Sequence, residues 1–168
     1  MNSADDGEND SILHEGIKLL QDMKIQDYNQ WRMKNLTIRP DLRDQDFSGK
    51  DLSGAYLNGA SCLRTNLSHC NLSKVNFVQS ELNTANFEGA NLTDAILMYS
   101  EMEECNLINA DLTRANFMNA NLQNSNLTNG KMSKTNFVQA NLINAKLPNV
   151  DRSAVYLKYS KLEGTAWK

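Results

Sequence analysis

A five-residue repeat is the feature that most constrains this chain. From residue 42 to residue 162, every fifth position carries Leu or Phe at 21 of 25 places, and no insertion shifts the phase. The residue two places before each of these positions is Ala, Ser, Thr, Cys, Gly or Val at 22 of the 25 places. We refer to the large residue as the centre of its repeat. The centres that depart from Leu and Phe are Cys62, Met102, Met132 and Arg152.

A period of five fits neither the 3.6-residue period of an α-helix nor the two-residue alternation of an open β-strand. The chain must therefore turn repeatedly around one axis, with the large centre inside and the small residue beside it. Repeated without gaps, this pattern predicts a solenoid whose core is built from stacked coils. Asn or Asp commonly precedes the centre, as at Asn86 and Asn116, where its side chain can hydrogen-bond nearby backbone and support a tight turn.

These residues resemble the pentapeptide-repeat family, whose consensus is A(N/D)LXX. The consensus is matched by Ala-Asn-Phe at 85–87 and 115–117, by Ala-Asn-Leu at 90–92 and 120–122, and by Ala-Asp-Leu at 110–112. The resemblance covers residues 40–164 and implies an all-β solenoid, a right-handed quadrilateral parallel β-helix in which four repeats make one 20-residue coil. Residues 40–168 would then hold 25 repeats in about six coils, stacked at roughly the 4.8 Å spacing of β-strands.

The segment before the repeats predicts an α-helical N-terminal cap over residues 10–39. Its apolar side chains recur at roughly helical spacing, with Asp10 or Ser11 as the N-cap. These apolar residues are Ile12, Leu13, Ile17, Leu20, Met23, Tyr28 and Trp31. Because stacked coils expose an open edge, we expect this segment to cap the rod as one helix or as a helix pair. Breaks are expected at Gly16 and Ile25. The alternative is a helix that binds a partner.

The two ends of the chain complete this organisation. Trp31, Arg32 and the Pro-Asp-Leu sequence at 40–42 resemble the start of short cyanobacterial members of the family. Residues 1–9 are acidic and polar, so we expect a disordered tail there. At the other end, Trp167 is expected to fold over the last coil. We expect a monomer, with an end-to-end homodimer through the C-terminal coil as the alternative.

The sequence contains no motif for catalysis, for a cofactor or for a metal. Only His14 and His69 could act as general bases near neutral pH, and neither has a nucleophile at a meaningful spacing. The cysteines are odd in number and lack paired spacing, so we expect reduced, buried thiols at Cys62, Cys70 and Cys105. The prediction is a protein that is not an enzyme and has no catalytic residues, no cofactor and no metal site.

Charge and hydropathy limit the classes of partner. The 17 basic and 20 acidic residues give a net charge of −3, which is too balanced to indicate nucleic acid or an anionic membrane. The chain starts with an acidic polar stretch and has no long apolar run, so neither a signal peptide nor a membrane span is indicated. We expect a cytoplasmic location and an unknown protein partner.

Function is expected on the outward positions, which in the family lie immediately before, immediately after and two after each centre. Advancing by 20 residues gives the side chains that stack on one face of the rod. One such face carries an apolar and aromatic stripe that we predict to bind the partner. It consists of Val78, Ile96, Met98, Tyr99, Met118, Val138, Tyr156 and Tyr159, beside Tyr56, Gln79, Asn119 and Gln139. Exposed apolar patches often mark interfaces, although scattered surface apolar residues are also common, so a tolerated variable position is the alternative.

The sequence therefore favours a non-catalytic protein-binding or regulatory scaffold. The alternative that the resemblance offers is a DNA mimic that binds DNA gyrase, as in the quinolone-resistance members of the family. Mimicry of duplex DNA requires an acidic surface, whereas residues 40–168 carry 12 basic and 13 acidic side chains, a net charge of −1.

Overall fold

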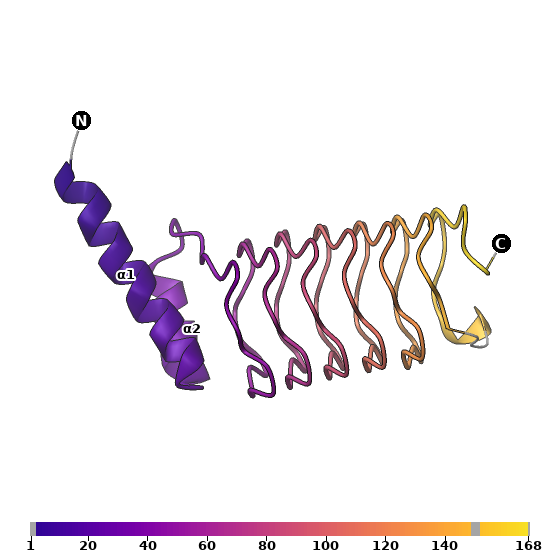
Figure 1. Cartoon of the computed structure of the whole chain (residues 1–168), viewed down its shortest axis with the longest axis horizontal. Coiled ribbons are helices and arrows are strands. Elements are labelled where there is room, and N and C mark those ends of the chain that lie inside the picture. The colour runs from indigo at the N-terminus through magenta and orange to yellow at the C-terminus, as the bar shows by residue number, and fades with distance from the viewer. Residues whose placement is uncertain (1–2, 149–151, 168) are drawn as a thin grey trace.

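The protein is a rod of stacked coils with a helical cap at its N-terminal end (Figure 1). The computed structural model describes residues 3–148 and 152–167, and side chains from Asp10 onward. The cap consists of α1 (Ser3–Gln21) and α2 (Ile25–Lys34), and a short 3-10 helix, η1 (Arg152–Ala154), lies near the other end.

Successive coils are joined by isolated parallel β-bridges between residues 20 positions apart. The column that begins at Asp41 continues through residues 61, 81, 101, 121, 141 and 161. Each bridge is a single residue long because a turn follows every centre. Backbone hydrogen bonds such as Leu42 N–H to the Ser61 carbonyl (2.7 Å) and Phe77 N–H to the Ile96 carbonyl (2.8 Å) connect the coils. The predicted solenoid with a 20-residue coil is therefore present.

The core lies inside the coils, as the five-residue pattern predicted. All centres from Leu42 to Leu142 are buried, and so is every residue two places before a centre from Ala55 to Ala145. Most polar members of the second set donate to the previous coil. The Thr65 hydroxyl donates to the Leu42 carbonyl (2.7 Å), and the Cys70 thiol donates to the Phe47 carbonyl (2.8 Å). These bonds satisfy polar atoms that would otherwise be unpaired in the core.

The turn after each centre has a repeated backbone conformation. Every fifth residue from Asp44 to Asn144 has a positive φ, near 60° where the residue is not glycine. The Gln45 N–H donates to the Leu42 carbonyl (3.2 Å), so centre Leu42 starts a four-residue turn whose third residue has the positive φ of a type II turn. The residue before the centre supports the turn, since the Asp46 carboxylate accepts the Ser48 N–H at 2.8 Å.

The cap is a helix pair whose helices meet closely. Met23 has a φ of 57° and ends α1 in a Schellman motif, in which Lys24 N–H donates to the Leu19 carbonyl (2.8 Å) and Met23 N–H to the Leu20 carbonyl (3.0 Å). Gly16 does not break α1, contrary to the sequence prediction. A methyl group at Gly16 would lie 2.5 Å from the Trp31 ring, so glycine is present because α2 packs directly against it.

The start of α1 also differs from the prediction. The helix begins at Ser3, so residues 3–9 are helical rather than a disordered tail, and the predicted N-cap at Asp10 or Ser11 lies inside the helix. Residues 1 and 2 lie outside the described residues. The sequence of this segment is acidic, and acidic residues stabilise a helix N-terminus through the helix dipole, which gives the physical reason for the extension.

Side chains of α2 cover the open edge of the first coil. The Asn29 amide donates to the Gly54 carbonyl (3.0 Å), and its oxygen accepts the Tyr56 N–H (2.9 Å). The buried guanidinium of Arg32 donates to the Asn58 carbonyl (3.2 Å). Asn29 and Arg32 thus take the hydrogen-bonding place of a preceding coil.

The C-terminal coil is less regular. Arg152 occupies a centre that the repeat would bury, yet it is exposed and lies in η1, because an unpaired guanidinium is too costly to bury. Trp167 is buried, as the sequence predicted, and its indole N–H donates to the Pro148 carbonyl (2.9 Å).

Candidate interaction face

The predicted binding residues share one side of the rod, which we term the apolar face. It comprises the outward positions 56, 58 and 59 and the positions 20, 40, 60, 80 and 100 residues further on. Parallel bridges join Tyr56, Asn76, Ile96, Asn116, Asn136 and Tyr156 in one column. All eight predicted residues lie on this face, so the 20-residue stacking inferred from the sequence brings them onto one surface.

Exposure differs across the face. The tyrosines are the most exposed of its apolar side chains, with Tyr159 at 73%, Tyr156 at 56% and Tyr99 at 52%. Ile96 is 38% exposed, whereas the four residues immediately after the centres are half-buried. These four are Val78, Met98, Met118 and Val138. The aromatic rings and Ile96 therefore present the accessible apolar surface, and the Val and Met side chains form its floor.

Ile96 stands where the repeat itself favours Asn. In the same column, the Asn116 side chain accepts the Met118 N–H (3.1 Å), and the Asn136 side chain accepts the Val138 N–H (3.0 Å) while donating to Asn116 (3.0 Å). Ile96 can make neither bond, and among the described residues the Met98 N–H has no hydrogen-bond partner. A net contribution of about 0.5–1.5 kcal/mol per hydrogen bond is forgone there.

Apolar residues at this repeat position are confined to the apolar face. On this face the residue before the centre is apolar or aromatic in three of six coils, at Tyr56, Ile96 and Tyr156, and Asn in the other three. From residue 41 to residue 146 the other three faces carry only Asp, Asn, Ser, Glu or Lys at that position. The apolar residues before the centre are thus clustered on one face. If this repeat position merely tolerated variation, they would be spread over all four faces.

Two tyrosines of the apolar face also adopt an unfavourable backbone conformation. Tyr99 has a φ of 59° and Tyr159 a φ of 63°, in the left-handed region that Gly and Asn tolerate best. Some other turns of the rod place Gly or Asn at the equivalent position, for example Gly59 and Asn119 on this face, and others place a polar residue there, for example Gln79 and Gln139. At Tyr99 and Tyr159, an exposed ring is present despite its backbone cost.

The apolar face is almost uncharged. Lys158 is the one charged residue among its 18 outward positions, and its ammonium lies 4.9 Å from the centroid of the Tyr159 ring. The adjacent face, defined by positions 41, 43 and 44 and their 20-residue repeats, carries ten charged residues, and we term it the charged face.

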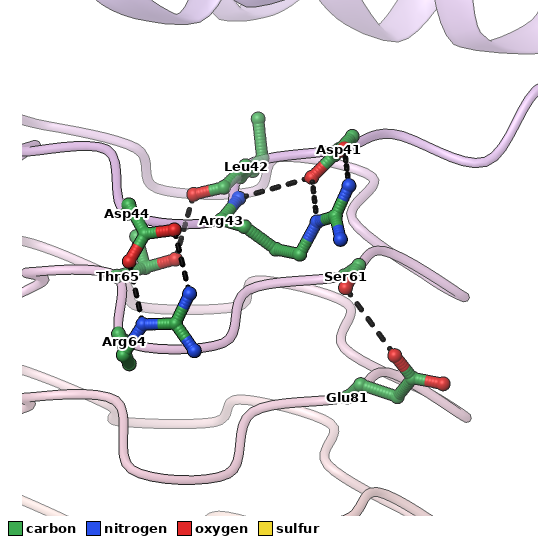
Figure 2. Close-up of polar contacts among 8 residues, drawn as sticks. All are labelled: Asp41, Leu42, Arg43, Asp44, Ser61, Arg64, Thr65 and Glu81. Carbon is green, nitrogen blue, oxygen red and sulfur yellow. Dashed lines mark hydrogen bonds and ion pairs between the residues drawn. The ribbon is translucent and has the colours of Figure 1, made fainter.

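Figure 2 shows the N-terminal part of the charged face. Arg64 reaches across to Asp44 of the preceding coil, with nitrogen–oxygen distances of 2.6 and 2.7 Å, and Arg43 folds back onto Asp41. The hydrogen bond from Arg64 lowers the pKa of the Asp44 carboxyl below its ordinary value. Part of the charge of this face is therefore paired locally, within a coil between Arg43 and Asp41 and between coils by Arg64 and Asp44.

The apolar face continues onto the cap. A surface hollow of about 520 Å³ lies where α2 meets the first coil and is lined by Asn29, Gln30, Met33, Lys34 and Tyr56. Met33 is 61% exposed. Sequence reasoning missed Met33 and Lys34, because the repeat register begins only after α2. Tyr56, which the prediction set beside the stripe, was the only signal that pointed toward them.

Other groups considered from the sequence lie apart from the apolar face. The three cysteines are buried free thiols, and burial raises the pKa of Cys70 to about 11 and that of Cys105 to about 12. His14 and His69 are exposed, one on α1 and one on the rod. Within residues 3–148 and 152–167, no group of three or more His, Cys, Asp or Glu side chains is placed to hold a metal ion. No helix in that described part is long and apolar enough to cross a membrane.

Comparisons with known proteins agree with the repeat. The family model for pentapeptide repeats matches in eight copies, over residues 41–73, 60–97 and 100–139. No curated protein matches the chain.

Several solved structures are similar to this chain. A pentapeptide repeat protein from the Arabidopsis thaliana thylakoid lumen is 31% identical over 66% of this chain and 70% of that chain, with a TM-score of 0.40. The pentapeptide repeat protein Rfr23 from the cyanobacterium Cyanothece 51142 is 25% identical over 83% and 97%, with a TM-score of 0.32. QnrB1, a plasmid-mediated fluoroquinolone resistance protein, is 22% identical over 72% and 86%, with a TM-score of 0.38.

Proposed function

Because the chain belongs to the pentapeptide-repeat family, whose members form right-handed β-helices, we propose that it is a non-catalytic scaffold that binds a partner protein through the apolar face. The observation that carries this proposal is the choice of residue at Ile96 and Tyr99. The column favours Asn at position 96 and the positive φ favours Gly or Asn at position 99, and at both an exposed apolar or aromatic side chain is present instead.

The composition of the face supports a protein as the partner. Interfaces are enriched in Tyr and Met and depleted of charge at their centre, and the apolar face has this composition. Flexible Met side chains such as Met98 and Met118 also adapt to the shape of a partner. The proposal places the scaffold in the cytoplasm, which the three free thiols support because disulfides rarely form in reducing compartments.

The test is partner capture by matched variants. The full chain would be immobilised and exposed to lysate of the source organism, and bound proteins would be identified by mass spectrometry. The variant Met98→Lys, Met118→Lys puts two charges on the apolar face. Its control, Leu63→Lys, Ile143→Lys, makes the same change at the equivalent half-buried position of the charged face.

We expect the partner to be lost from the first variant and kept by the control. Circular dichroism and thermal unfolding would establish that both variants remain folded. A partner that both variants retain equally would move the binding site away from the apolar face and contradict the proposal.

Mimicry of DNA is the weaker alternative. The apolar face carries no carboxylate, and on the charged face Arg43 and Arg64 offset neighbouring aspartates. The proposal therefore predicts that the chain leaves gyrase supercoiling activity unchanged in a plasmid assay. Inhibition of supercoiling by the chain would favour the alternative.

A further inference from the structure

The backbone of the apolar face leaves little for an extended partner to bind. Gln79 N–H donates to the Met98 carbonyl (3.0 Å), Tyr99 N–H to the Met118 carbonyl (3.0 Å) and Asn119 N–H to the Val138 carbonyl (3.1 Å). Coil-to-coil bonds of this kind use the main-chain groups that a peptide strand would need for β-addition. An α-helix satisfies its own backbone, so it can bind here through side chains alone.

The spacing of the face suits a helix that lies along the rod. Side chains in one column repeat at roughly the 4.8 Å separation of β-strands, and one helical turn rises about 5.4 Å. The two periods therefore differ by only about 0.6 Å per step. From Tyr56 to Tyr156 the column has five steps, about 24 Å, which a helix of about 16 residues would span.

Charge is present only at the two ends of this surface. Lys158 lies at the C-terminal end, and Lys34 lines the hollow beside Tyr56 at the N-terminal end. Neither lysine forms an ion pair with a carboxylate among the residues whose side chains the structure describes. The middle of the face, around Met98 and Met118, is uncharged.

This charge pattern disfavours a second copy of the chain as the occupant. Two copies stacked antiparallel would bring Lys34 of one near Lys158 of the other, and two copies stacked parallel would bring each lysine near its equivalent. Like charges would face each other in either arrangement, which disfavours association. Acidic groups on a different partner would meet both lysines favourably.

Resting on the proposed function, we propose that the segment bound by the apolar face is an amphipathic α-helix of about four turns that lies along the rod and carries acidic residues near both ends. Its apolar side chains would recur at helical spacing and contact Ile96, Tyr99 and the two methionines. Its acidic residues would pair with Lys34 and Lys158.

A selection from a library of random peptides tests this proposal. A phage library of random 18-residue peptides would be selected on the full chain after depletion on the folded Met98→Lys, Met118→Lys variant. Recovered peptides would be synthesised, and their affinities measured by fluorescence anisotropy for three proteins. These are the wild type, the Lys34→Glu, Lys158→Glu variant, and a control variant, Lys74→Glu, Lys134→Glu, with the same change in net charge at exposed lysines elsewhere on the rod.

We expect recovered peptides to space apolar residues by three and four positions, to carry Asp or Glu toward both ends, and to gain helical circular dichroism on binding. Their affinity should fall by about five- to ten-fold for Lys34→Glu, Lys158→Glu and stay unchanged for the control variant. Replacing the peptide's acidic residues by lysine should restore binding to Lys34→Glu, Lys158→Glu.

Peptides with two-residue alternation or without a helical signal, equal affinities for the two charge variants, or self-association of the wild type through Met98 and Met118 would each overturn the helix proposal. The lysate experiment separates this failure from that of the proposed function. A native partner lost only from Met98→Lys, Met118→Lys would keep the scaffold proposal even if no helical peptide were recovered.

Discussion

The apolar face and the charged face share one backbone and one core, and they differ only in what points outward. Coil-to-coil bonds are within 0.1 Å of each other in the two examples of Phe77 N–H to the Ile96 carbonyl at 2.8 Å and Leu82 N–H to the Glu101 carbonyl at 2.7 Å. On the charged face, Arg64 and Asp44 pair locally across coils. On the apolar face, Ile96 forgoes hydrogen bonds that an asparagine makes in the same column, and Tyr99 adopts a positive φ that glycine or asparagine tolerates better. Because the interior stabilises both faces, outward residues that oppose the turn's own preference indicate function.

The largest expected effects lie in the shared interior. Phe117 stacks on Phe137 beneath the apolar face, with ring centroids 5.2 Å apart, and Leu122 is the next buried centre, beneath the charged face. Phe117→Ala should lower the free energy of unfolding by about 3–5 kcal/mol and Leu122→Ala by about 2–5 kcal/mol, through lost burial and a cavity. Urea unfolding measures both. A loss below about 1 kcal/mol at either site would show that the two faces do not share one tightly packed core.

A smaller effect, with opposite sign, is expected at the turn of the apolar face. Tyr99→Gly should raise the free energy of unfolding by about 1 kcal/mol, because glycine adopts a positive φ without strain. The same change should weaken partner capture. The control is Thr84→Gly at the equivalent turn of the charged face, where φ is 59°. It should stabilise similarly and leave capture unchanged, and a loss of capture in both variants would argue against a face-specific role.

Ile96→Asn sharpens the comparison further. An asparagine there can accept the Met98 N–H and join the ladder with Asn116, which offsets the lost apolar contacts of Ile96. We expect a gain of about 0.5–1 kcal/mol in thermal or urea unfolding together with weaker capture. If the variant were more stable and captured the partner as well as the wild type, Ile96 would be a tolerated residue rather than a binding one.

The smallest effect is expected at two exposed ion pairs, one on the charged face and one on another face of the rod. Hydrogen bonds lower the folded-state pKa of Asp44 through Arg64 and that of Asp94 through Arg114. Because these pKa values lie below those of the unfolded chain, the carboxylates stabilise the fold above about pH 4 and lose this contribution as the pH falls through their folded-state values. Asp44→Asn, Asp94→Asn should therefore reduce the acid sensitivity of unfolding slightly, and high salt should reduce it as well.

The measurement is thermal unfolding between pH 2 and pH 7 for the variant and the wild type. Identical pH profiles would show that these ion pairs contribute nothing measurable to the free energy of unfolding, which is the case for many exposed ion pairs.

The repetitive part of the fold could be predicted because every repeat reports the same constraint. The large centres and the small residues before them fixed which side chains lie inside, and the 20-residue coil then placed Met98 above Val78 and below Met118 without any further information. The Asn residues before the centres support turns as expected. The candidate face followed from this register, and its role in binding remains a prediction.

Features that occur once could not be predicted in this way. Gly16 was interpreted as a helix break because its contact, the Trp31 ring, comes from a second helix whose packing the sequence does not encode locally. Arg152 has the register of a buried centre, and only the desolvation of its guanidinium excludes it from the core. Met33 and Lys34 join the apolar face through the docking of α2, which no repeat specifies.

Site-specific photo-crosslinking tests the central claim most directly. A p-benzoylphenylalanine would replace Met118 on the apolar face in one preparation and Ile143, at the equivalent half-buried position of the charged face, in another. After irradiation in lysate, the account predicts one dominant crosslinked protein from position 118 and little from position 143. Equal crosslinking from both positions, or crosslinking to a specific protein from position 143 alone, would contradict it.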